Sequence, residues 1–417
     1  MLSHYHAQLF SHVSPFFDAE QIVHIPINNN KEDHNSTTLT NQTGRSNRTS
    51  IIICIILAIT GQSIARLLET FYHHHNIYWS LQDGIWTQHL LHVIGFPLLI
   101  LPFFSSKKHN QLLITSNPSS LALLYLCTGV TMVVHIKLYT KGKLEIPSTK
   151  FILYEGTQLY FTTLFAGLVN RIRFNTWIVI SLIFTLAITV LSFNVDGECS
   201  ALLSAITFSF LLSNIHVIFH NFVTNSKNKK PRFTYVLELL IFSSLFATVA
   251  SVFIPDENID LTREMDGFSK GKSVYIMTII GQAVSWQIYW VGLVGLVLFV
   301  DSIVTSNVES VGLVVSADSI MTANIVSLST YPVVMVLKIM FCNYEDDEFD
   351  GFLVASLALF AISVGSCFYK HVRVLREIGN WKPPRLLWFL FVWVICIAYM
   401  FVLSDHYIYS PTGFESL

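Results

Sequence analysis

The stretch "IIGQAVSWQIYWVGLVGLVLFV", residues 279–300, is long enough to cross a lipid bilayer as a single helix. Three polar side chains nevertheless lie inside it: Gln282, Ser285 and Gln287. A side-chain amide in hydrocarbon is unfavourable unless another polar group pairs with it. The stretch therefore predicts a membrane-spanning helix whose amides find partners within the protein.

The composition of the whole chain agrees with this prediction. Of its 417 residues, 52% are hydrophobic and only 12% are charged, whereas soluble domains average roughly 25% charged residues. Its six cysteines are scattered and form no CxxC pair, so we predict neither a disulfide framework nor a zinc site. We expect an all-α, polytopic membrane protein.

Apolar runs of bilayer length recur along most of the chain and give the predicted spans. The ten runs are residues 51–68, 85–104, 119–140, 147–169, 176–194, 200–223, 234–254, 274–300, 318–341 and 351–369. Ten spans are compatible with two inverted five-helix repeats, which we place at 51–194 and 195–372. We expect a disordered cytosolic tail at 1–50 and a linker at 373–417. The linker contains one further candidate span, 386–404.

Lysine and arginine residues in the short loops predict the orientation. The loops after the second, fourth, sixth and tenth spans are basic and share one side if the spans alternate, so the N-terminus is expected in the cytosol. One loop disagrees: "KLYTKGKLE" (137–145) carries Lys137, Lys141 and Lys143 on the predicted outer side.

Polar residues within the predicted spans are the candidates for a binding site. Any one of them can serve merely as a hydrogen bond between helices. Amides on at least three spans, with an indole beside one of them, favour a shared polar cavity. There a planar heterocycle would stack on Trp286 and pair with Gln62, Gln158 and Gln287.

Several motifs also resemble those of a known protein family. The stretches "VLELLIFSSLFATVASV" (236–252) and "EMDGFSKGKSVYIMTIIGQAVSWQ" (264–287) closely resemble the plant purine permease family of the drug/metabolite transporter superfamily. "GQSIARLLETFY" (61–72) and "IPSTKFILYEGTQLYF" (146–161) are similar to its first and fourth spans. The resemblance implies ten spans in two repeats. It also implies proton-coupled uptake of purine bases, cytokinins or related heterocycles such as alkaloids, usually at the plasma membrane.

The chain departs from the family pattern at several polar positions. His135 and Ile136 stand where the family has Asp-Asn, Leu240 and His92 each replace a Gln, and Thr162 replaces an Asn. Each exchange removes an amide or moves a charge that can bind substrate or protons. These departures keep an alternative open, a non-transporting descendant that binds a ligand or a partner and signals.

Proton coupling requires a group that titrates between the two membrane faces. Glu155 is the first candidate, because a carboxyl within an apolar helix can take up and release a proton. Glu238 matches the family but lies near the cytosolic end of its span, where a structural ion pair is an equally good interpretation. His135 is a third candidate, for which we favour an interfacial position near the outer face.

Clusters of histidine raise a different class, the integral-membrane di-iron oxygenases. The groups are "YHHHN" (72–76), the pair His89 and His92, and the pair His216 and His220. The first two groups lie toward the outer face and the third toward the cytosolic end of its span, so they cannot share one metal site. We therefore expect a transporter and not an enzyme, with no metal and no cofactor. Its expected partners are a small planar nitrogenous heterocycle, protons and the lipid bilayer, and not nucleic acid.

Overall fold

The computed structural model describes residues 35–76, 85–107, 113, 118–146, 148–170, 198–224, 232–253, 261–308, 317–331, 333–334 and 337. The chain divides into two units, Met1–Gly44 and Arg45–Leu417. The described residues of the first unit are the helical residues 35–44. The start of that helix at Asn35 lies inside the segment for which we predicted a tail, 1–50.

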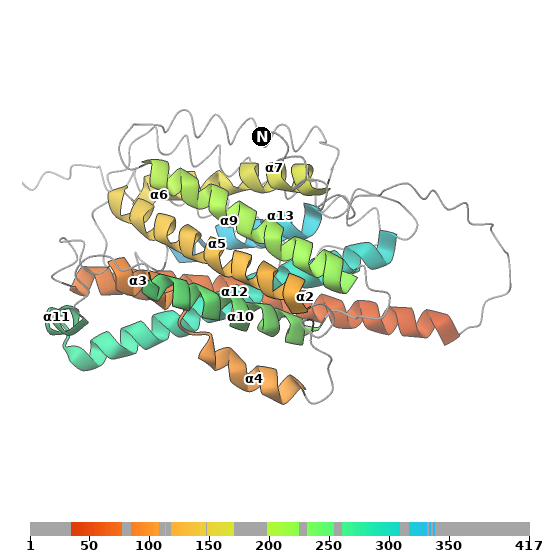
Figure 1. Cartoon of the computed structure of the whole chain (residues 1–417), viewed down its shortest axis with the longest axis horizontal. Coiled ribbons are helices and arrows are strands. Elements are labelled where there is room, and N and C mark those ends of the chain that lie inside the picture. Colours follow the sequence, from red (N-terminus) through yellow and green to blue (C-terminus); the bar gives the residue numbers. More distant parts are fainter. Residues whose placement is uncertain are drawn as a thin grey trace, which may run out of the picture. The chain divides into compact units, whose positions relative to one another are not determined.

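The described secondary structure is helical apart from one isolated bridge between Asn76 and Phe268. This confirms the predicted all-α class. The helices, drawn in Figure 1, are α2 (Asn35–His75), α3 (Ile85–Leu91), α4 (Pro97–Lys107), α5 (Pro118–Glu145), α6 (Ser148–Gly156), α7 (Gln158–Asn170), α9 (Glu198–Phe219), α10 (Phe233–Phe253), α11 (Leu261–Asp266), α12 (Lys272–Val308) and α13 (Ala317–Leu328), with a π-helical turn η3 (His220–Thr224) directly after α9.

Within the described residues, five helices are long and apolar enough to cross a membrane. They are Thr49–His75, Pro118–Glu145, Cys199–Val223, Phe233–Phe253 and Lys272–Asp301. Two other predicted spans, 85–104 and 147–169, are helical but interrupted near their middles. The span predicted at 318–341 is described only in part, by α13 and the residues that follow it. The runs 176–194, 351–369 and 386–404 lie outside the described residues, so ten spans and an inverted repeat stay predictions.

One prediction about a loop is wrong. Residues 137–145, which we read as an outer loop, form the last turns of α5. Lys143 is retained in the helix because its Nζ lies 2.6 Å from Oε2 of the buried Glu69 in α2. Lys141 pairs with Glu145 one helical turn further along, at 3.7 Å. On which side of the membrane these lysines lie stays a prediction.

The packing of α2 against α12 depends on small residues. A Cβ atom added to Gly61 would lie 2.8 Å from the carbonyl oxygen of Ser285, and one added to Gly292 would lie 2.6 Å from that of Cys54. Side chains larger than hydrogen therefore do not fit, and the two backbones approach closely, as helices do in membranes. This contact brings the polar residues of α2 next to those of α12.

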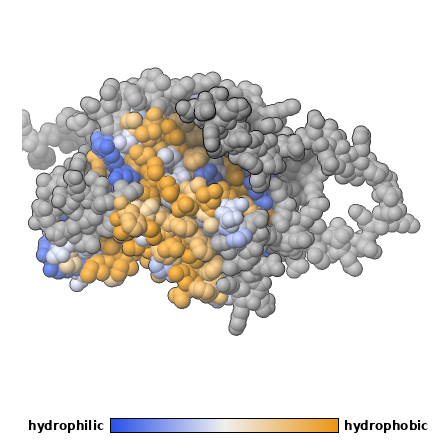
Figure 2. All heavy atoms as spheres, in the orientation of Figure 1, coloured by the Kyte–Doolittle hydropathy of each residue, from blue (hydrophilic) through white to orange (hydrophobic). Residues whose placement is uncertain are grey.

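Other neighbours complete the arrangement around α12. The helix α5 packs along α9 and α10, while α13 packs against α12 and α7, as can be followed in Figure 1. Large apolar side chains are exposed on the outside of several helices, among them Leu101 and Phe104 of α4 and Met277 of α12. Figure 2 shows one face of the described residues that is mostly apolar. Such a surface fits contact with lipid.

Candidate functional site

Both interrupted spans break at a polar position. Between α3 and α4, residues 92–96 form turns, and between α6 and α7 the helix is interrupted at Thr157. Thr157 donates a hydrogen bond from its own hydroxyl to the carbonyl of Tyr154, at 2.7 Å. A broken helix inside a membrane protein leaves backbone groups that must be paired locally, and such breaks are typical of transporter binding sites.

Gln287 of α12 hydrogen-bonds to backbone carbonyl groups at the first of these breaks. Its Nε2 donates to the carbonyl oxygens of His92 and Val93, at 3.2 and 3.3 Å. Its Oε1 is buried and has no hydrogen-bond partner among the described residues. Gln282 serves a different purpose, because its Nε2 donates to Oε1 of Gln88 at 2.5 Å and so ties α12 to α3. The Nε2 atoms of both amides of α12 thus find partners within the protein, as predicted.

Aromatic rings gather beside Gln287. The imidazole of His92 stacks on the indole of Trp286, with ring centroids 3.8 Å apart and planes 24° apart. Tyr139 of α5 meets both rings edge-on, at 5.6 Å from His92 and 6.3 Å from Trp286. The face of Trp286 on which we expected a substrate therefore carries a heterocyclic ring of the protein itself.

A buried arginine lies over the ring of Tyr139. The Arg66 guanidinium of α2 lies 5.5 Å from the ring centroid of Tyr139 and 3.8 Å from that of Tyr331, and it donates to the hydroxyl of Tyr331 at 2.7 Å. The neighbouring donors orient the amide of Gln62, whose oxygen accepts from Arg66 at 2.9 Å while its nitrogen donates to Thr330 at 2.8 Å. An arginine within a span is costly unless it is paired in this way.

Glu155 continues the same network from α6. The hydroxyl of Tyr331 donates to Oε2 of Glu155 at 3.1 Å, and the hydroxyl of Ser204 donates to Oε1 at 3.2 Å. The Nε2 of Gln158 also donates to Oε2 of Glu155. Tyr331 thus accepts from Arg66 and donates to Glu155, so one hydroxyl links a fixed positive charge to a carboxyl that can titrate.

Several buried polar atoms of this site have no hydrogen-bond partner among the described residues. They are Nε1 of Trp286, Nε2 of His92, the hydroxyl of Tyr139, Oε1 of Gln158 and Oε1 of Gln287. Buried donors and acceptors are almost always paired in folded proteins, so a group of exceptions in one place calls for an explanation. A ligand with both donors and acceptors on a planar ring can supply it.

The remaining candidates lie as follows. Glu238 of α10 accepts from the backbone nitrogen of Leu113 at 2.9 Å and from the hydroxyl of Tyr125 at 3.3 Å. These contacts join α10 to its neighbours rather than to Glu155. His135, which we expected at the outer interface, is instead buried beside Ser204, with its Nδ1 3.1 Å from the Ser204 carbonyl oxygen.

Arg66 and Tyr331 were missed by the sequence reasoning. The signal for Arg66 was present, because it follows Gln62 by four residues and so lies on the same face of α2. An arginine in the middle of an apolar run is itself a marker of function. Tyr331 carried no such signal, since a tyrosine inside an apolar run is common.

Comparison with known proteins agrees with this picture of a membrane transporter. A family described as purine nucleobase transmembrane transport matches residues 49–311. The chain is 42% identical to "Purine permease 14" of Arabidopsis thaliana, over 84% of this chain and 94% of that protein. It is 40% identical to "Putative purine permease 15" of the same plant, over 81% of this chain and 90% of that protein.

The match by residues 49–311 extends over more than half of the chain, and the two relatives are covered almost in full. The chain therefore belongs to the purine permease family. It is a multi-pass membrane transporter and not an enzyme, as the sequence predicted.

Proposed function

We propose that this chain imports purine nucleobases or related planar nitrogenous heterocycles, such as cytokinins, together with protons across the plasma membrane. The family supports purine transport. The proposed class of substrate is supported by the group of unpaired polar atoms around Trp286, His92 and Tyr139. A purine offers a flat aromatic face for stacking and ring nitrogens that can pair with an amide oxygen or an indole N–H.

The position of His92 suggests how a substrate binds. Its imidazole covers Trp286 as a purine ring would, at 3.8 Å. A substrate that stacks on the same face has to displace His92 and then meets the free Oε1 of Gln287 beside it. The proposed substrate-binding residues are still Trp286, Gln287, Gln158 and Gln62. We add His92 as the side chain that the substrate displaces.

Proton coupling is proposed to use Glu155. Its carboxyl accepts three hydrogen bonds, from Tyr331, Ser204 and Gln158. Protonation would weaken the bond from Gln158 and free that amide for the substrate. The carboxyl of Glu238, with its backbone partner at Leu113, is better suited to holding α10 in place.

The complete architecture belongs to the same proposal. We propose ten spans in two inverted repeats, 51–194 and 195–372, with the breaks of α3–α4 and α6–α7 facing a site between them. Both breaks contain residues of the candidate site, His92 in one and Glu155 and Gln158 beside the other. Both breaks belong to the first repeat, and residues of the second repeat contact them: Gln287 donates to the His92 carbonyl and Tyr331 donates to Glu155. In transporters with inverted repeats, substrates bind between the two halves, at broken helices.

A binding-only protein is a second candidate, which the stacked His92 favours. If His92 does not give way, a ligand can bind at the edge of the site without passing through it. A competition uptake panel in a yeast strain lacking its own purine permease separates the two. Accumulation of labelled adenine supports transport, whereas saturable binding without accumulation supports the second candidate.

The substrate site itself is tested by Trp286→Ala. Loss of the stacking surface should abolish saturable uptake at normal surface expression, because an aromatic pair contributes about 0.5–1.5 kcal/mol beyond its buried area and the cavity adds to the loss. Phe299→Leu is the matched control, since Phe299 is a buried aromatic of α12 that packs on Phe233 at 5.1 Å. Unchanged apparent affinity in Trp286→Ala would remove this residue from the site.

A further inference from the structure

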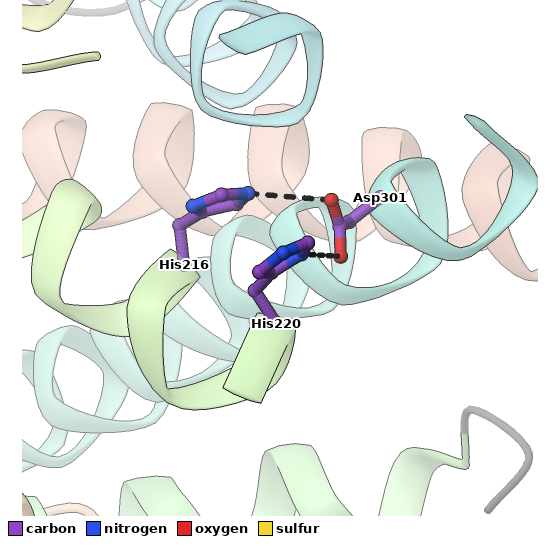
Figure 3. Close-up of side chains that lie close together, drawn as sticks. All are labelled: His216, His220 and Asp301. Carbon is purple, nitrogen blue, oxygen red and sulfur yellow. Dashed lines mark hydrogen bonds and ion pairs between the residues drawn. The ribbon is translucent and has the colours of Figure 1, made fainter. Parts of the chain in front are cut away.

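Three potential metal-ligating side chains meet at one end of α9 and α12, away from the site described above. His216 is in the last turn of α9, His220 begins the π-helical turn η3, and Asp301 is in α12 (Figure 3). One ligand atom from each lies within 4.8 Å of the other two. Within the part of the chain that the structure describes, this is the one such group of three.

The distances suit a bound ion. The Nε2 of His216 is 3.2 Å from Oδ1 of Asp301, and the Nδ1 of His220 is 3.6 Å from Oδ2. Two ligand atoms that are each about 2.0–2.1 Å from a tetrahedral zinc ion lie roughly 3.3 Å apart. The observed separations lie on either side of this value, so a small rotation of His220 is enough to close the site.

The pairing of His220 is incomplete without an ion. At 3.6 Å its contact with Asp301 is too long for a hydrogen bond. The Nδ1 atom is buried and has no hydrogen-bond partner among the described residues, although it points at the carboxylate as Figure 3 shows. A cation bound by the carboxylate would give Nδ1 of His220 a partner.

Local structure and burial also support a metal site. Two histidines four residues apart on a helix present their imidazoles on one face, a common arrangement for binding a metal ion. The two rings stack with centroids 5.5 Å apart and planes 18° apart. His216 and Asp301 are each only 1% exposed, whereas His220 is 30% exposed and leaves a path for an ion to enter. π-helical turns occur frequently at functional sites.

We propose that His216, His220 and Asp301 bind a divalent first-row transition-metal ion of the Zn²⁺ type. Imidazole and carboxylate ligands suit such ions, and three protein ligands leave a coordination position for water. The ion would fasten α9 to α12. The sequence prediction of no metal site overlooked Asp301, which lies 85 residues from His216.

Metal binding by the purified full-length protein in lipid nanodiscs tests the proposal. Metal-free protein is titrated with Co²⁺, whose absorption reports on coordination, and then with Zn²⁺ in competition. We expect one equivalent to bind to the wild type. Asp301→Asn and His220→Asn should each weaken binding by more than the roughly 100-fold that loss of an outer-shell partner can cause, because each removes a ligand itself.

The matched control is His73→Asn. His73 also lies next to a carboxylate one helical turn away, with Nε2 3.8 Å from Oε1 of Glu69, but no third metal-ligating group joins them in the described residues. Its substitution should leave binding unchanged. Wild-type protein that binds neither ion, or that binds as weakly as His220→Asn, would overturn the proposal and leave a plain histidine–carboxylate contact.

The variants are compared only where size-exclusion profiles match the wild type. If Asp301→Asn does not fold, the partly exposed His220 still provides the decisive variant. Because binding is measured without transport, the result does not depend on whether the chain carries purines.

Discussion

The carboxylate of Glu264 and the aromatic stack at Trp286 are both buried, but their polar atoms are paired to different degrees. Glu264 of α11 accepts hydrogen bonds from the hydroxyls of Tyr72 at 2.8 Å, Thr87 at 3.0 Å and Tyr275 at 3.0 Å. These donors come from α2, α3 and α12. Around Trp286, in contrast, donors and acceptors remain unpaired within the described residues.

The difference separates two uses of buried polar groups. A carboxylate surrounded by its own donors holds helices in one arrangement, because any movement breaks several bonds together. A site with unpaired donors and acceptors gains them from a ligand, and so binds most strongly what completes it. From this comparison we propose that the Glu264 cluster is structural and that the Trp286 cluster recognises the substrate.

The largest effect is expected from Arg66→Gln. The substitution removes the positive charge that faces Tyr331 and Gln62, and breaking a buried charged network costs about 3–5 kcal/mol. Initial uptake of labelled adenine should fall by at least about 100-fold, since each 1.4 kcal/mol is tenfold. Arg66→Lys, which keeps the charge but not the planar fork, should retain part of the activity. Equal loss in both variants would show that charge is not what matters.

Glu155→Gln should alter the pH response more than substrate binding. Gln keeps the shape and much of the hydrogen bonding of Glu but cannot carry a proton. We expect wild-type uptake to rise at acidic external pH and the variant to show a flat profile, with the competition constant for adenine little changed. Uptake that still rises at acidic pH in the variant would move the proton role to His135 or Glu238.

A smaller and selective effect is expected for Gln287→Leu. Its free Oε1 is available to a ring N–H of the substrate, so the variant should lose about tenfold in affinity for the preferred purine and spare analogues without that donor. Gln282→Leu is the matched control, because the amide of Gln282 has the same pairing, with Nε2 donating and Oε1 without a partner among the described residues, but contacts Gln88 of α3 and not the turn at 92–96. It should affect all substrates alike. A selective loss in Gln282→Leu instead would reverse the two assignments.

Glu264→Gln should leave selectivity untouched. Gln offers one acceptor in place of two, so we expect a loss of about 1 kcal/mol in stability, measured as a lower melting temperature in detergent, and an unchanged substrate ranking. A change in the substrate ranking would place the Glu264 cluster within the binding site, and its role would then not differ from that of the Trp286 cluster.

The sequence was informative where one physical signal dominated. Uninterrupted apolar runs predicted the spans of α5, α9, α10 and α12, because length and hydropathy alone decide which helices can cross a bilayer. The amides of α12 correctly predicted polar contacts with other parts of the protein, which the Nε2 atoms of Gln282 and Gln287 make. Family motifs led to the right family before any contact was known.

The sequence was less informative where the structure of a segment depends on residues far away in the chain. The break at Thr157 lies in an apolar run that reads as continuous, whereas Gly95 and Pro97 were a local signal for the turn at 92–96 that the span prediction passed over. Residues 137–145 read as a loop partly because the partner of Lys143, Glu69, is far away in the sequence. Arg66 and Tyr331 likewise are recognised as a pair only from their contact with each other in the structure.

The glycine contacts between α2 and α12 have a consequence for movement during transport. Because Gly61 and Gly292 hold the two backbones against each other at two points, neither helix can slide along the other without steric overlap. The pair should therefore move as one rigid body, and alternating access must come from other elements rocking against it. Spin labels at Ile64 and Ile288, both exposed, should keep one distance with and without adenine, while a distance that changes would show that the two helices part.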